Sequence, residues 1–87
     1  MDPKQYCSDT LTTLQRADVH PLTPERAQVH VLLAHFSRFA PPDGVAFARE
    51  LAQIAGEAER HGRSGLAAAA REVLTEWEHR KRTRPGA

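Results

Sequence analysis

Prolines and glycines divide the chain into four segments of helical length. Pro3, Pro24 and the pair Pro41-Pro42 each begin or end such a segment, and Gly62 separates the last two. Proline fits the first turn of a helix but removes a hydrogen bond from a helix interior, so a regular helix does not run through these positions. The pattern limits the 87-residue chain to short helices joined by short connections.

Each segment opens with a residue that stabilises a helix N-terminus. Asp2, Thr23, Asp43 and Ser64 stand at these starts, and their side chains can accept hydrogen bonds from the first free backbone N–H groups. Gly62 is placed as a left-handed glycine that ends the third helix. The expected helices cover residues 3–17, 24–40, 44–61 and 65–82.

Apolar residues recur at helical spacing in all four segments, and no segment alternates as a strand does. These residues form one inward stripe per helix, and Phe39 widens the second stripe. The stripes are Cys7, Leu11 and Leu14; Val29, Leu32, Leu33, Phe36 and Ala40; Phe47, Leu51, Ile54, Ala55 and Ala58; and Leu66, Ala70, Val73, Leu74 and Trp77. We predict an all-α bundle of three or four helices, with short connections and antiparallel neighbours.

The length and composition favour one small domain in a reducing compartment. We expect residues 1–82 to form a single helical domain and residues 83–87 a flexible C-terminal tail. No apolar stretch approaches the roughly 20 residues that cross a bilayer, and no signal-peptide pattern is visible. Cys7 is the single cysteine, which favours a cytoplasmic setting. Abundant Ala, Arg, Gly and Pro indicate a GC-rich bacterial or phage genome.

The sequence contains no arrangement typical of an enzyme, a metal site or a cofactor site. His30 and His35 are five residues apart, so they lie on opposite flanks of their helix and not on one metal-binding face. No serine stands in a nucleophile elbow, and no glycine-rich loop is present to hold a phosphate. Cys7 falls on an apolar stripe and is expected in the core. We therefore expect no catalytic residue, metal or cofactor.

Residues Glu50–Gly56 resemble the first helix and turn glycine of a bacterial helix-turn-helix. The resemblance covers these seven residues alone. The segment Glu57–Arg60 that follows favours a continuing helix, and the fourth helix opens with alanines that offer almost nothing to a base edge. We expect Gly56 to lie inside a helix, where it permits a close helix approach or a mild kink.

Basic residues are concentrated at the end of the fourth helix, where they allow two interpretations. They can bind nucleic-acid phosphates, or they can pair with acids one turn earlier, as Glu76 with Arg80 and Glu78 with Arg82. A DNA- or RNA-binding regulator is therefore our alternative function. The residues that would carry it are Arg80, Lys81, Arg82 and Arg84.

The second helix carries more apolar surface than one inward stripe requires. Ala27, Val31 and Ala34 point nearly opposite to that stripe, so the helix is either central in the bundle or shared with a partner. Trp77, beside the charged C-terminus, is either a core residue or a half-covered anchor for a partner. We predict a small protein-protein interaction module, an adaptor, regulator or assembly factor. It would bind another protein or a second copy through Ala27, Val31, Ala34 and Trp77.

Overall fold

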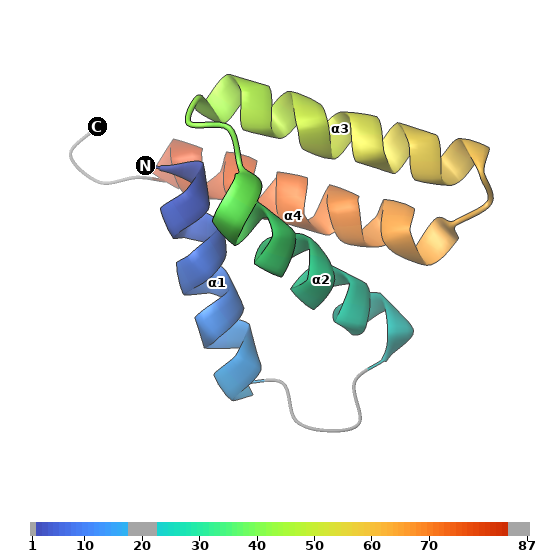
Figure 1. The fold of residues 1–87 in the computed structure, drawn as a ribbon, viewed down its shortest axis with the longest axis horizontal. Coiled ribbons are helices and arrows are strands. Elements are labelled where there is room, and N and C mark those ends of the chain that lie inside the picture. Colours follow the sequence, from blue (N-terminus) through green and yellow to red (C-terminus); the bar gives the residue numbers. More distant parts are fainter. Residues whose placement is uncertain (1, 18–22, 84–87) are drawn as a thin grey trace.

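The computed structural model describes residues 2–17 and 23–83, which form four α-helices (Figure 1). The helices are α1 (Pro3–Ala17), α2 (Pro24–Phe39), α3 (Gly44–Arg60) and α4 (Ser64–Thr83). No strand occurs within those two ranges. The predicted all-α helical bundle is confirmed, with four helices.

The predicted capping residues Thr23 and Asp43 form hydrogen bonds with the first turns of their helices, and Gly62 has the predicted left-handed backbone. The Thr23 hydroxyl accepts a hydrogen bond from the Arg26 N–H at 3.1 Å, and the Asp43 carboxylate accepts one from the Val45 N–H at 3.2 Å. Gly62 has a φ of 71°, a left-handed conformation that glycine adopts without strain. These local features set the bounds of α2 and α3.

The start of α4 differs from its prediction by one residue. Ser64 is the first helical residue, and the Ala67 N–H donates a hydrogen bond to the Arg63 carbonyl at 3.0 Å. Arg63 therefore occupies the capping position expected for Ser64. The helix ends at Thr83, and the rest of the predicted tail, residues 84–87, lies outside the described residues.

The helices pack in the order α1, α2, α4, α3, so that α2 and α4 form the centre of the row. Figure 1 shows α3 and α4 running antiparallel side by side, and α1 and α2 doing the same. The connection through Pro41-Pro42 lets α3 lie along α4 while it meets α2 at the Phe36 and Phe47 rings. The second helix therefore has the central position that was one of its two predicted alternatives, although its side with Val31 and Ala34 is exposed.

One aromatic side chain from each helix contributes to a single buried cluster. Tyr6, Phe36, Phe47 and Trp77 are each at most 3% exposed. Their rings meet edge to face, with centroids between 5.0 and 6.4 Å apart. Such pairs contribute about 0.5–1.5 kcal/mol each beyond the burial of their area. The cluster links all four helices at one point of the core.

Most of the predicted inward residues are buried, with exceptions at the edges of the stripes. Five are only partly buried: Leu11, Leu14, Ile54, Leu66 and Leu74. Phe39 is 67% exposed, so the prediction that it widens the inward stripe of α2 is wrong. Phe39 lies beside the exposed His35 ring, whereas the next residue, Ala40, is 3% exposed, so Phe39 is on the solvent side of the last turn of α2. Tyr6 is buried although it was not predicted in the first stripe.

Gly56 lies within α3, four residues before its end, and no turn interrupts the helix there. The segment resembling a helix-turn-helix is therefore continuous helix. A Cβ at Gly56 would meet only the Arg60 side chain, at an ordinary 3.8 Å. The close helix approach expected at this glycine is wrong, because no atom of another helix lies within 4 Å of that Cβ.

Candidate protein-binding surface

Large apolar side chains are exposed at three positions in the described part of the chain. They are Val31, 61% exposed, Phe39, 67% exposed, and Val45, 52% exposed. Two of the three belong to α2, and the third lies in the first turn of α3. The exposed apolar surface is therefore concentrated on one helix.

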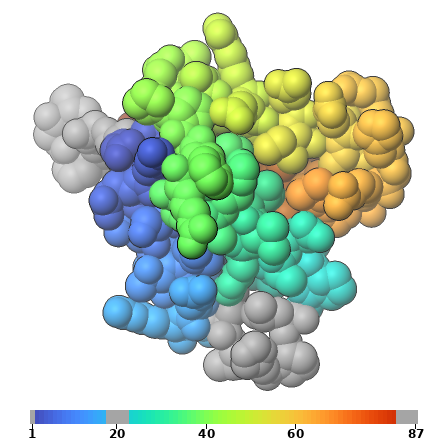
Figure 2. All heavy atoms as spheres, viewed as in Figure 1, coloured from blue at the N-terminus to red at the C-terminus, as the bar shows by residue number. Residues whose placement is uncertain are grey.

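The side of α2 opposite its buried stripe is open to solvent. Val29, Leu33 and Phe36 face inward, whereas Val31 and Ala34 are exposed and Ala27 is half-buried. In the space-filling view α2, coloured teal to green, lies in front with no other helix over it (Figure 2). A core position for Val31 and Ala34 is excluded, because the neighbours of α2 pack on its inward side.

His35 and Phe39 extend this exposed surface toward the end of α2. Their ring centroids are 5.3 Å apart, and Val31, His35 and Phe39 follow one another at intervals of four residues. We define the outer face of α2 as Ala27, Val31, Ala34, His35 and Phe39. Phe39 was not predicted on this face, although its spacing of four residues from His35 indicates that the two side chains are neighbours.

Trp77 is not part of an exposed surface. It is 1% exposed, and its ring packs against Tyr6 at 5.1 Å and Phe47 at 5.0 Å between centroids. The prediction of a half-covered tryptophan at the end of α4 is therefore wrong. Its stripe position was correct, but the sequence did not show that rings from α1 and α3 would cover it.

Two of the cations at the end of α4 lie beside carboxylates of the same helix. Arg80 Nε is 2.8 Å from Glu76, as the spacing predicted, and Lys81 Nζ is 3.7 Å from Glu78. The prediction from helical spacing was a pair between Glu78 and Arg82. The Arg80 guanidinium also lies over the Tyr6 ring, 5.9 Å from its centroid.

Arg82 is exposed, and Arg84 lies outside the described residues. The described end of α4 thus carries charges of both signs, because Glu76 and Glu78 lie beside Arg80 and Lys81. A phosphate would have to compete with these carboxylates for their cations.

The Cys7 thiol is fully buried, as expected for a core residue. Burial raises its pKa to about 12, with a smaller contribution from Asp2, so it is protonated at neutral pH. A protonated thiol is a poor nucleophile. Within residues 2–17 and 23–83, no three His, Cys, Asp or Glu side chains gather to hold a metal ion. No helix in these ranges is long and apolar enough to span a membrane.

No protein-family model matches this chain, and no curated protein or solved structure resembles it significantly. The outer face of α2 brings together three of the four residues predicted to bind a partner, Ala27, Val31 and Ala34.

Proposed function

We propose that this chain is a small, non-enzymatic protein-protein interaction module that binds its partner through the outer face of α2. Its role would be that of an adaptor, regulator or assembly factor. One observation carries the proposal: Val31 and Phe39 are exposed on the helix whose opposite side already supplies Leu33 and Phe36 to the core. Folding leaves these apolar side chains in water, and a partner would remove them from it.

The outer face of α2 has the composition of a small binding surface. Phe39 is an exposed aromatic side chain beside His35, and large aromatic side chains contribute strongly to binding when a partner buries them. Burial of apolar area yields roughly 25 cal/mol for each Å². Ala34 and the half-buried Ala27 are small, so a partner can approach the α2 backbone closely between the larger side chains.

The alternative, a nucleic-acid-binding regulator, has less support. It depends on Arg80, Lys81, Arg82 and Arg84, of which the first two lie beside carboxylates. Binding to phosphates weakens steeply as salt rises. A gel shift lost at raised salt would favour this alternative, whereas association through apolar side chains resists salt.

A cytoplasmic setting is part of the proposal. Cys7 is the single cysteine of the chain and is free and buried, so the fold makes no use of an oxidising compartment.

Phe39→Asp tests the proposal, with Val45→Asp as its control. Both replace an exposed apolar side chain by a carboxylate, but only Phe39 belongs to the outer face of α2. Self-association is measured by sedimentation, and partner binding by capture from a lysate of the organism that encodes the chain. We expect Phe39→Asp to lose a complex that Val45→Asp retains, because an unpaired charge is costly to bury. Equal behaviour of the two variants contradicts the proposal.

A further inference from the structure

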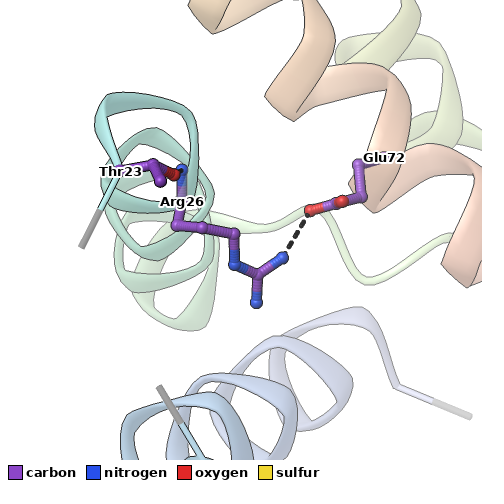
Figure 3. A network of polar contacts seen from close by, with 3 residues as sticks. All are labelled: Thr23, Arg26 and Glu72. Carbon is purple, nitrogen blue, oxygen red and sulfur yellow. Dashed lines mark hydrogen bonds and ion pairs between the residues drawn. The ribbon is translucent and has the colours of Figure 1, made fainter. Parts of the chain in front are cut away.

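Arg38 lies on the same side of α2 as its outer face and has no acid to pair with. It is seven residues after Val31, which brings it to within about 20° of Val31 around the helix. Arg38 is exposed, and no carboxylate in residues 2–17 and 23–83 forms an ion pair with it. The other arginine of α2 is used by the fold, because Arg26 reaches Glu72 of α4 with 3.0 Å between guanidinium nitrogen and carboxylate oxygen (Figure 3).

The chain on either side of Arg38 supplies no acid to the outer face of α2. Residues 26–42 contain neither Asp nor Glu. Asp43 follows them, but its carboxylate accepts the Val45 N–H at the start of α3. Glu25 precedes them, and at six residues before Val31 it lies about 120° away from it around α2. The outer face of α2 is therefore an apolar surface with a cation beside it and no anion.

The side chains of this surface are arranged in the rows on which helices pack. Residues spaced by four form two neighbouring rows along α2: Ala27, Val31, His35 and Phe39, and beside them Ala34 and Arg38. A second helix packs a row of its own side chains into the groove between two such rows. Because Ala34 is small, that helix can come close, and a carboxylate at its edge then meets Arg38.

A second copy of the chain does not supply this carboxylate. Its own outer face of α2 also has Arg38 beside it, and its residues 26–42 are equally free of acid. Two such faces would bring unpaired cations into one interface, and like or unpaired charges are costly there. A different protein that offers acids avoids this cost.

We propose that the partner of the outer face of α2 is a different protein, which presents an amphipathic helix with aspartate or glutamate beside its apolar stripe. The apolar stripe covers Val31 and Phe39, and a carboxylate at its edge pairs with Arg38. This inference rests on the proposed function and adds the chemistry of the partner to it.

Two helical peptides that differ in the sign of their charge test this partner. Each has about 20 residues, since shorter isolated helices are marginal in water, and each has leucines at helical spacing. One carries glutamate beside the leucines and the other carries lysine. Binding is followed by NMR through the methyl signals of Val31 and Ala34 and the ring signals of Phe39. We expect the glutamate peptide to bind about tenfold more tightly, the lower end of the coupling between close charge pairs across an interface.

Arg38→Glu is the test variant, and Arg49→Glu is its matched control. Both replace an exposed arginine by glutamate and change the net charge equally, but Arg49 lies on α3. We expect Arg38→Glu to reverse the preference, so that the lysine peptide binds more tightly, and Arg49→Glu to keep it. Equal binding of the two peptides by the unaltered chain, binding of neither, or the same effect in both variants overturns the acidic partner.

Phe39→Asp separates this inference from the function on which it rests. If the unaltered chain binds both peptides equally and Phe39→Asp loses both, the outer face of α2 binds helices and only the acidic partner is overturned. If Phe39→Asp binds the peptides as the unaltered chain does, the proposed function fails as well. A dimer in sedimentation that Phe39→Asp dissociates assigns the face to a second copy and overturns the proposal of a different protein.

Discussion

Gly44 and Trp77 lie so close that the first residue of α3 has no room for a side chain. A Cβ at Gly44 would stand 2.9 Å from Trp77 Cζ2, closer than real Cβ contacts come. Trp77 is 1% exposed and joins the aromatic cluster from α4. The glycine thus allows the start of α3 to cover the tryptophan ring.

Gly44→Ala should therefore destabilise the fold. The added methyl group must displace the indole ring or the start of α3, and forced overpacking typically costs about 1–3 kcal/mol. Urea unfolding followed by tryptophan fluorescence measures the change. Gly65→Ala is the control, because nothing lies within 4 Å of a Cβ at Gly65. Alanine there should leave the stability unchanged or raise it, and equal midpoints for the two variants would exclude the proposed clash.

Leu51 and Leu74 should differ in their effect on stability although both were predicted in the core. Leu51 is fully buried, whereas Leu74 is only partly buried at the edge of the core. Leu51→Ala should cost about 2–5 kcal/mol, the usual range for a buried leucine. Leu74→Ala should cost less, because part of its side chain is already in water. Thermal unfolding of both variants decides the order, and a larger loss for Leu74→Ala would contradict the packing of α3 on α4.

The stability of the fold should fall as pH rises above about 9. The Cys7 thiol has a pKa raised to about 12 by burial, against an ordinary value of 9.0 in an unfolded chain. Above pH 9 the unfolded state therefore releases a proton that the folded state keeps. The stabilisation is complete below pH 9 and is lost between pH 9 and pH 12.

The measurement is the unfolding free energy at pH 8, 9 and 10 for the unaltered chain and Cys7→Ala. The slope between pH 9 and pH 10 should be shallower in the variant by about 1 kcal/mol per pH unit. The difference between the two slopes isolates Cys7, since the other titrating groups are common to both proteins. Identical slopes would show that the thiol is not protected from ionisation.

The helix ends could be predicted because their chemistry is local. Thr23-Pro24, Asp43 and Gly62 each act on backbone groups within a few residues, so the sequence alone identifies them. The capping position of α4 was predicted at Ser64 and lies one residue earlier, at Arg63. Helix boundaries commonly shift by one or two residues because the terminal turns fray.

The residues that the sequence misplaced depend on contacts between helices. Periodicity placed Trp77 at the end of a stripe, but its cover comes from Gly44 and from rings on α1 and α3. Phe39 has the spacing of an inward residue and yet no helix lies over it. Tyr6 lies about 100° around α1 from Cys7, and its burial follows from the Phe47 and Trp77 rings that pack against it from α3 and α4. None of these neighbours can be identified from helical spacing alone.

Of the outer face of α2, the sequence predicted Ala27, Val31 and Ala34, either as a partner surface or as part of a central helix. Val31 is exposed, as the interface alternative requires, while the partner itself remains a proposal. We expect Val31 to serve association and not folding.

The most direct test measures helicity and association together for Val31→Asp, beside the unaltered chain and Val45→Asp. Because Val31 is 61% exposed, the charge should cost little in the folded monomer, and far-UV circular dichroism should be unchanged. Sedimentation and partner capture should show the complex lost in Val31→Asp and kept in Val45→Asp. Full helicity with unaltered association and capture in Val31→Asp would contradict a role of Val31 in binding, and loss of helicity would show that Val31 belongs to the core.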